Sequence, residues 1–376
     1  MIYQLLYSTV ALCFGVSVFF RYVNDGMNFE FRSALSLLVL FLGEPFCHYV
    51  VGEVGGLLLY GLACVVMYLL LPAGEVTIKD RVVLITGCDS GFGHALAQHL
   101  DSLGCVVFAG CLHGDGEGAT SLASSCSAQL KILQLDVTDA QQVDQARQVV
   151  QEYLGPHRGL WGLVNNAGLV YFGELDLLPF SMVQRSIDVN LVGMLRMTKT
   201  FLPLLRKGKG RVINMSSIAG SVPLMFMCAE GAAKAGVEAA SHILRQELKK
   251  WGVQVSIVQP FAFKTGWQSS ESMLTNYNQI RQALDKDTLD TYGLDYLDAF
   301  KHNLLNEESL NEDLGQVIGV MTDALTSRGP RAWYPCGRGT RSLVWLSNLL
   351  PTSILDMILP LLMLQIDVTP TGLRER

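Results

Sequence analysis

The sequence predicts an α/β protein in which N-terminal transmembrane segments precede a doubly wound parallel sheet. Three observations carry this prediction. The 376 residues are 50% hydrophobic and only 16% charged, whereas a soluble domain carries about 25% charged residues. The apolar excess is concentrated in residues 1–72, which contain six charged residues. From Arg81 onward, short β-branched runs alternate with helical stretches, which is typical of a parallel sheet covered on both faces.

Residues 1–78 are predicted to form a membrane anchor. Uncharged apolar runs cover 2–20 and 55–72, and each is long enough to span a bilayer, which takes about 17–25 residues. The run 34–51 is marginal because Glu44, Pro45 and His48 interrupt it. No Lys or Arg precedes the first run, which argues against a cleaved signal peptide.

The basic residues beside these runs predict that the following domain is cytosolic. Arg21 and Arg32 follow the first run, and residues 33–78 contain neither Lys nor Arg. Lys79 and Arg81 follow the last run, so three spans would place both basic segments in the cytosol. A single span, with the other apolar residues in the membrane interface, is the alternative. We expect the protein to be located in the endoplasmic reticulum membrane, with the mitochondrial membrane as the less favoured location.

Residues 79–340 are predicted to form the sheet domain, and residues 341–376 an apolar tail associated with the membrane. Hydrophobic periodicity distinguishes the expected strands from the expected helices. Strands are expected at 81–87, 105–110, 131–137, 160–168, 211–217 and 253–260. Helices are expected at 93–104, at 140–154, over a long region ending at 206, and at 229–251. Right-handed crossovers make a doubly wound sheet the default arrangement.

Charge and cysteine usage exclude several classes of protein. The net charge of −6 argues against a nucleic-acid partner, because such proteins present a basic surface. Nine cysteines occur without a CxxC pair, so the sequence indicates neither a disulfide framework nor a metal site.

A glycine-rich turn follows the first predicted strand. It reads Thr86-Gly87-Cys88-Asp89-Ser90-Gly91-Phe92-Gly93 and opens the first helix. Glycines let the backbone approach a pyrophosphate, and the helix N-terminus attracts its charge. A preceding strand and a following helix are the context that supports such a motif. The turn therefore predicts a dinucleotide site in a Rossmann-type sheet.

The spacing T-G-x3-G-x-G resembles that of the short-chain dehydrogenase/reductase family, and further motifs extend the resemblance over residues 79 to about 340. These are Asp136-Val137, Asn165-Asn166-Ala167-Gly168, Asn190 in DVNLVG, Ser217 in NMSS, Lys234 and Thr265. The resemblance implies that Asn190, Ser217 and Lys234 are catalytic. It implies cofactor contacts from Thr86, Gly87, Ser90, Gly91, Phe92, Gly93, Asp136, Val137, Asn165, Ala167, Gly168, Lys234 and Thr265.

Within that family the chain is most similar to the membrane-bound retinol, hydroxysteroid and 3-hydroxybutyrate dehydrogenases, on stretches such as LITGCDSGFG and GLWGLVNNAG. Its head and tail are most similar to the oxidative type 2 hydroxysteroid dehydrogenases. The resemblance implies NAD-dependent oxidation of a lipophilic secondary alcohol, with a hydroxysteroid ahead of retinol. Residues 267–308, rich in Leu, Tyr, Met and Asp, are expected to form the substrate lid.

The sequence departs from the family pattern at two positions of the site. The family's catalytic tyrosine lies thirteen residues after the serine and four before the lysine, and here that position is Glu230. A carboxyl group has an ordinary pKa of about 4.3, and Lys234 is expected to lower it further. Glu230 would then accept a proton during alcohol oxidation but have none to give at pH 7, unless burial raised its pKa. Phe261 stands where the family has glycine and is expected to crowd the nicotinamide.

The choice of cofactor rests on charge, because a 2′-phosphate needs a cation. Residues 105–118 contain no Lys or Arg, and Asp115 and Glu117 are acidic, so NAD is favoured over NADP. Cys111 stands where NAD enzymes of the family often carry aspartate.

Two functions stay open: a dehydrogenase of steroid or retinoid alcohols, and a catalytically silent, membrane-anchored dinucleotide-binding protein. The sequence does not decide the oligomeric state, and both a homodimer and a monomer are compatible with it.

Overall fold

The computed structural model describes residues 2–25, 31–71, 74–265, 270–305, 311–362, 366 and 368–374. The chain divides into two compact units. The first comprises Met1–Thr77 with Thr326–Pro330, and the second comprises Ile78–Leu325 with Arg331–Arg376.

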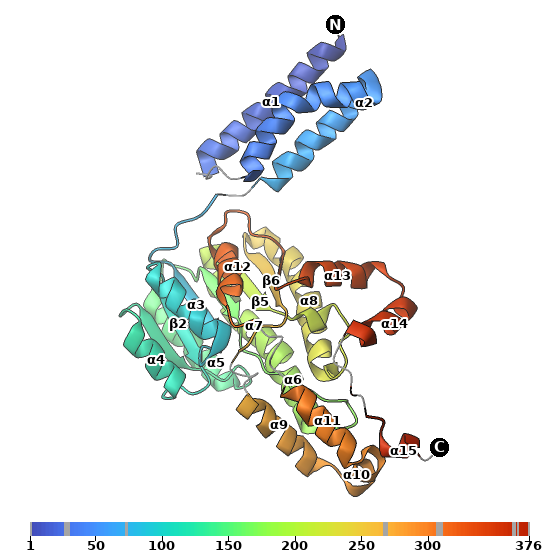
Figure 1. The fold of residues 1–376 in the computed structure, drawn as a ribbon. Coiled ribbons are helices and arrows are strands. Elements are labelled where there is room, and N and C mark those ends of the chain that lie inside the picture. The colour runs from blue at the N-terminus through green and yellow to red at the C-terminus, as the bar shows by residue number, and fades with distance from the viewer. Residues whose placement is uncertain are drawn as a thin grey trace. The chain divides into compact units, whose positions relative to one another are not determined.

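The first unit contains two apolar helices, α1 (Ile2–Asp25) and α2 (Phe31–Leu70) (Figure 1). The longer helix, α2, bends at Gly52, whose φ of 78° lies in the left-handed region that glycine adopts without strain. The Tyr60 hydroxyl donates to the Leu40 carbonyl oxygen at 3.3 Å. This contact across the bend lays the two halves of α2 beside each other as a helical hairpin.

Two stretches of these helices are long and apolar enough to cross a membrane, Ile2–Phe20 and Leu35–Leu69. Only 11% and 22% of their most apolar windows are buried within the protein. Helices of a soluble core would bury far more of their apolar surface, so this exposure favours contact with lipid. The number of crossings and the side on which the domain lies stay predictions.

The second unit is built on a seven-stranded sheet whose neighbouring strands are all parallel. Its strands are β1 (Val82–Thr86), β2 (Val106–Cys111), β3 (Leu130–Gln134), β4 (Gly162–Asn165), β5 (Arg211–Met215), β6 (Gln254–Pro260) and β7 (Trp333–Cys336). The order β3-β2-β1-β4-β5-β6-β7 is that of a doubly wound sheet with one added edge strand. The predicted fold class is confirmed. The edge strand β7 was not predicted.

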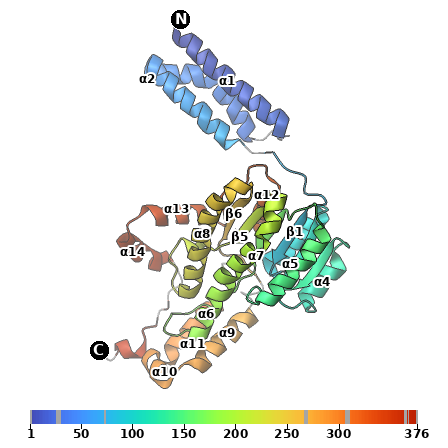
Figure 2. The same cartoon turned by 180° about the vertical axis from the view of Figure 1, so that it is seen from behind.

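Helices cover both faces of the sheet, which Figures 1 and 2 show from opposite sides. One hydrophobic cluster joins β1, β2, β4, β5 and β6 to α5 (Ala140–Leu154), α7 (Met194–Gly208) and the end of α8 (Cys228–Leu248). On the other face, α3 (Gly91–Ser102) packs on β1 and β2 and against α4 (Glu117–Ser125). Leu325, in α12 (Gly315–Thr326), lies against Gly162 of β4.

The long helical region expected before residue 206 is divided. It consists of α6 (Phe180–Ile187), the π-helix η1 (Asp188–Gly193) and α7. Two short 3₁₀ helices, η2 (Ile218–Gly220) and η3 (Lys249–Trp251), flank α8. π-helical turns are rare and occur frequently at functional sites, and η1 contains Asn190.

The expected lid and tail are both helical where the structure describes them. The lid consists of α9 (Ser270–Ala283), α10 (Lys286–Tyr292) and α11 (Leu294–Leu304), while residues 267–269 and 306–308 of that region lie outside the described residues. The tail contains α13 (Thr340–Leu349), α14 (Thr352–Leu362) and α15 (Thr371–Arg374). Buried residues of α13 and α14 pack on Ile218 and Val222, which follow β5. The tail therefore lies against a loop that borders the candidate site.

Candidate active site

A cavity of about 1650 Å³ lies at the carboxyl ends of the strands. Its wall includes residues that follow β1, β4 and β5, such as Gly87, Asn166 and Ser217. Ligands of doubly wound sheets bind at this edge, where the strand order reverses. Of the predicted site residues, thirteen line the cavity: Gly87, Ser90, Gly91, Phe92, Asp136, Val137, Ala167, Gly168, Asn190, Ser217, Glu230, Lys234 and Thr265. Thr86, Gly93 and Asn165 lie behind its wall.

The glycine-rich turn is shaped by close backbone packing. A Cβ atom on Gly87 would lie 2.8 Å from the Ala167 Cα, and one on Gly93 would lie 2.3 Å from the Gly87 carbonyl oxygen. Gly87 and Gly91 also have φ values of 70° and 60°, which disfavour residues with a Cβ. The Ser90 side chain does not cap α3, and Ser90, Gly91 and Phe92 at the start of this helix line the cavity. This cradle fits a pyrophosphate.

The residues behind the wall hold this turn in place. Thr86 Oγ1 accepts hydrogen bonds from the backbone amides of Asn166 (3.1 Å) and Ala167 (2.9 Å). The Asn166 Nδ2 donates in return to the carbonyl oxygens of Thr86 and Gly87. Asn165 is buried and donates to Thr198 Oγ1 and Asn214 Oδ1. Thr86 and Asn165 thus shape the cofactor site from behind, while Asn166, which was not among the predicted contacts, borders it.

Carboxylates organise the end of the cavity near β2 and β3. Asp89 accepts hydrogen bonds from the backbone amides of Leu112 (2.9 Å) and His113 (3.0 Å), and all three residues line the cavity. Asp136 accepts from Thr138 and lies 3.5 Å from an Arg185 nitrogen. Burial opposes the ionisation of Asp136, but the Thr138 hydrogen bonds and the Arg185 charge outweigh it and lower its pKa. Asp89 and Arg185 were missed because their partners are distant in sequence.

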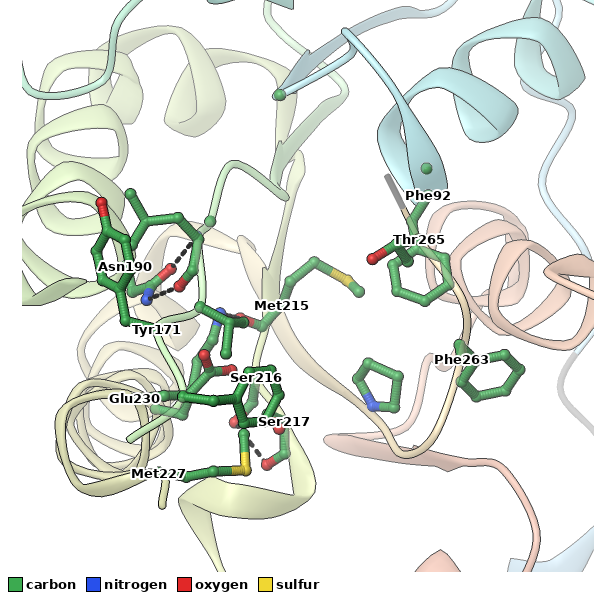
Figure 3. A pocket seen from close by; sticks show the side chains of 18 of the residues that line it. Phe92, Tyr171, Asn190, Met215, Ser216, Ser217, Met227, Glu230, Phe263 and Thr265 are labelled. Carbon is green, nitrogen blue, oxygen red and sulfur yellow. Dashed lines mark hydrogen bonds between the residues drawn. The ribbon is translucent and has the colours of Figure 1, made fainter. Parts of the chain in front are cut away.

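The remaining predicted catalytic residues meet where β5 and α8 face the cavity (Figure 3). Lys234 is buried and donates from Nζ to the Met215 carbonyl oxygen at 2.9 Å. Ser217 Oγ accepts from the Ala219 amide at 3.2 Å, which leaves its own proton for another acceptor. Asn190 is buried, and its side chain exchanges two hydrogen bonds with the backbone of Leu169. Asn190 therefore positions the chain that follows β4.

Glu230 differs from its sequence-based expectation in the direction of its pKa. Only 3% of the residue is exposed, and its Oε2 atom is buried without a hydrogen-bond partner. Burial raises its pKa to about 7, against the opposing effect of Lys234. The exception named for this expectation therefore applies, because desolvation raises the pKa of Glu230 more than the charge of Lys234 lowers it. Near pH 7 Glu230 can both accept and give a proton.

Phe261 lies between the cavity and a hydrophobic cluster. It borders the cavity, and it also packs against the cluster that includes Ile218, Val344 and Leu355. The crowding of the nicotinamide by this residue stays a prediction. A second aromatic residue after β6, Phe263, contacts the glycine-rich turn. Its ring makes an edge contact with that of Phe92, with 5.8 Å between the ring centroids (Figure 3). Thr265 lies beside this pair in the figure.

The other end of the cavity is apolar. Leu224, Met225, Phe226 and Met227, which precede α8, line it together with Met273 and Phe300 of the lid. Phe226 has a φ of 65°, a conformation that is rare and strained for a bulky residue. Its ring lies 5.8 Å from that of Phe300 in α11. The expected lid thus contributes directly to the cavity wall, and an apolar molecule would contact it.

The comparisons with known proteins agree with this geometry. A family model described as short chain dehydrogenase matches residues 81–274, and the chain belongs to this family. It is therefore an oxidoreductase that uses a nicotinamide dinucleotide. Within the family it belongs to the steroid and retinol dehydrogenase branch, as the relatives below show, and this prediction is confirmed.

Three relatives define the branch. Estradiol 17-beta-dehydrogenase 2 of Mus musculus is 40% identical over 309 residues, 81% of this chain and 81% of that protein. 17-beta-hydroxysteroid dehydrogenase type 6 of Homo sapiens is 40% identical over 287 residues, 75% of this chain and 88% of that one. Retinol dehydrogenase 16 of Mus musculus is 39% identical over 284 residues, again 75% and 88%.

A solved structure supports the fold. A short chain dehydrogenase/reductase from Burkholderia phymatum, crystallised in complex with NAD, matches with a TM-score of 0.60 and 20% identity, covering 72% of this chain and 94% of that one.

Proposed function

We propose that the chain is a membrane-bound, NAD-dependent dehydrogenase that oxidises a lipophilic secondary alcohol, a hydroxysteroid ahead of retinol. The observation that carries the proposal is Glu230. Its buried carboxyl group lines the cavity near Ser217 and Lys234, and its pKa is raised to about 7. A general acid–base catalyst works best with a pKa near the operating pH. The carboxyl can therefore take the part of the tyrosine that the family has at this position.

The described residues fit a nicotinamide dinucleotide. The cradle at Gly87 and Gly91 and the uncapped N-terminus of α3 suit the pyrophosphate. A nicotinamide bound there would supply the hydride acceptor that oxidation of an alcohol requires. Charge supports NAD over NADP, because Asp89 lines the cavity beside Leu112 and would repel a 2′-phosphate. A cation that would bind such a phosphate is absent from residues 105–118, all of which the structure describes.

Glu230 and Ser217 would handle the proton of the substrate hydroxyl. Ser217 Oγ, whose lone pair is engaged by the Ala219 amide, orients the substrate oxygen by donating to it. The ionised Glu230 accepts the hydroxyl proton at its carboxylate, which borders the cavity. Lys234 places a positive charge nearby, which stabilises the ionised form before transfer. In the reverse direction, protonated Glu230 gives the proton to the carbonyl oxygen.

The substrate class is supported by the apolar wall and by the relatives. Methionines and aromatic residues, including Phe226 and Phe300, line the end of the cavity beyond Glu230. Such a wall buries an apolar skeleton, and Asn303 of the lid offers a polar group in the same cavity. Relatives named as 17-beta-hydroxysteroid dehydrogenases match at 37–40% identity, and retinol dehydrogenases at 38–39%. A hydroxysteroid is therefore the first substrate to test.

Membrane attachment would bring the site to substrates that partition into lipid. The apolar head supports it, and the predicted location is the endoplasmic reticulum membrane with a cytosolic domain. The tail gives independent support, because Trp345, Leu349 and Met357 are exposed to 64%, 60% and 66%. Exposed apolar side chains of this kind favour the surface of a membrane.

The second candidate is a catalytically silent dinucleotide-binding protein, and the observation that favours it is again the missing tyrosine. Both functions predict a bound dinucleotide. They differ in whether an alcohol is turned over.

The deciding experiment measures NAD-dependent oxidation of estradiol, testosterone, cortisol and retinol by the full chain in detergent. We expect oxidation of at least one steroid, and a loss of kcat/KM of about 10²–10⁴-fold in Glu230→Gln, since this is the usual contribution of a general base. Glu247→Gln, an exposed glutamate on the same helix, is the matched control. Equal rates for the natural chain and Glu230→Gln would remove Glu230 from the chemistry. NADH binding without any turnover would support the silent function.

A further inference from the structure

Three side chains, two from the loop after β5 and one from β6, donate hydrogen bonds to one carboxylate, that of Glu238 in α8. Ser216 Oγ (2.6 Å) and Gln259 Nε2 (2.7 Å) donate to its Oε1 atom. Ser221 Oγ (2.7 Å) donates to its Oε2 atom. Hydrogen bonds to a charged acceptor are roughly twice as strong as those between neutral groups. Glu238 therefore ties α8 to β6 and to the loop that follows β5.

That loop carries the predicted catalytic serine. Ser216 and Ser221 are its two ends, and Ser217 lies between them, with Oγ set by the Ala219 amide inside the loop. Gly220 completes the contact, because a Cβ there would lie 2.7 Å from Glu238 Oε1. Glycine at this position therefore lets the loop lie close to Glu238 and to the backbone of α8 at Lys234. Any movement of the loop away from α8 would displace the Ser217 hydroxyl from the cavity.

Glu238 also completes a charged face of α8. Glu230, Lys234 and Glu238 follow one another at intervals of four residues, which places them on one side of the helix. Burial lowers the pKa of Lys234, while Glu230 and Glu238 both raise it. Near pH 7, Glu230 is protonated in a large fraction of molecules because its pKa is about 7. Glu238 is thus a second carboxyl group, besides Glu230, that acts on Lys234.

The network continues beyond the site. Gln259 accepts a hydrogen bond at Oε1 from the Trp333 Nε1 at 2.9 Å. The Ser347 hydroxyl, in α13, donates to the Ser221 carbonyl oxygen at 3.1 Å. The edge strand β7 and the tail helix α13 therefore both support the loop that Glu238 holds.

We propose that Glu238 is a positioning residue, which fixes the loop Ser216–Ser221 against α8 and β6 and thereby holds the Ser217 hydroxyl beside Glu230. Its effect on turnover rests on the function proposed above, whereas its hold on the loop does not. None of the family motifs in the sequence includes Glu238, so the sequence alone gave no reason to select it.

Hydrogen exchange of the full chain tests the hold on the loop without requiring activity. The amides of Gly220, Ser221 and Val222 are bonded within the loop and report its opening. We expect them to exchange about tenfold faster or more in Glu238→Ala, because charge-assisted hydrogen bonds are lost. Glu238→Gln keeps an acceptor oxygen and should change exchange much less. Glu247→Ala, exposed on the same helix, should leave these amides unchanged.

Kinetics then test the consequence for the reaction. In an active chain, Glu238→Ala should lower kcat more than it raises KM for the alcohol, and Glu238→Gln should restore most of the loss. Unchanged loop exchange in a folded Glu238→Ala variant would overturn the proposal. Faster exchange in a chain whose natural form shows no turnover would support the positioning role and count against the dehydrogenase function alone. If Glu238→Ala does not fold, Ser221→Ala removes one of the three bonds and should give a smaller acceleration in the same amides, and no acceleration would overturn the proposal.

Discussion

The raised pKa of Glu230 predicts a specific dependence of stability on pH. A carboxyl group whose pKa rises on folding contributes fully to stability only below its unfolded pKa. That contribution is lost as the pH rises through the folded pKa. For Glu230 the window runs from about 4.5 to about 7. Replacing Glu230 with Gln, which does not ionise, should remove this dependence.

The magnitude follows from the displacement of the pKa. A change from 4.5 to about 7 corresponds to ~3 kcal/mol between the two protonation states. Well above pH 7 the natural chain should therefore be destabilised, relative to Glu230→Gln, by ~3 kcal/mol more than at pH 4.5. At ~2 °C per kcal/mol for a large domain, the difference in melting temperature between the two chains should change by ~6 °C across this window.

Thermal unfolding of both chains in detergent, from pH 4.5 to pH 8.5, measures this change. A constant offset between the chains carries no information, because an unpartnered amide at this position has its own cost at every pH. Glu247→Gln should follow the natural chain throughout. A difference between the natural chain and Glu230→Gln that does not vary with pH would refute the account of Glu230 as a desolvated carboxyl group.

Four further outcomes follow from the site. Oxidation by the natural chain should increase as the pH rises through about 7, where Glu230 loses its proton, and reduction should decrease over the same range; two parallel profiles would contradict this assignment. Phe261→Gly should lower stability by about 2–4 kcal/mol, since the residue packs on the cluster that includes the tail helices, and should tighten the Kd of NADH by relieving the predicted crowding; an unchanged Kd would contradict that crowding. NADH should raise the melting temperature more than NADPH does, and equal stabilisation would refute the choice of NAD. Brominated lipids should quench the tryptophan fluorescence of the reconstituted chain less after Trp345→Phe, and equal quenching would place α13 away from the bilayer.

The sheet could be predicted from the sequence because its signals are local. Each of the first six strands is a short stretch with buried or partly buried apolar residues, and their ends differ from expectation by only a few residues. The strand β7 (Trp333–Cys336) was missed because its four residues include a proline and make an edge strand, which needs no long apolar run. The division of the helix before Arg206 by η1 was missed because a π-turn has no pattern distinct from that of an α-helix.

The candidate site was predictable only where sequence spacing fixes position. The glycine turn and the four-residue interval from Glu230 to Lys234 are such cases. The roles of Thr86 and Asn165 could not be predicted from spacing. Thr86 accepts a hydrogen bond from the Asn166 amide, and Asn165 donates one to Asn214. Glu238 was not predictable either, since its donors come from positions 17 to 22 residues away along the chain.

The pKa of Glu230 shows why spacing was insufficient at the centre of the site. The interval to Lys234 predicts attraction and a lowered pKa, but attraction depends on where the ammonium points and desolvation depends on the whole fold. Here Lys234 is bound to the Met215 carbonyl, and Glu230 is 3% exposed. A tyrosine at this position would need its pKa lowered from about 10, and burial would oppose that change. A carboxyl group needs its pKa raised, and the same burial supplies the shift. The replacement of tyrosine by glutamate is therefore compatible with proton transfer near neutral pH, because burial moves the pKa of the carboxyl group toward the working pH.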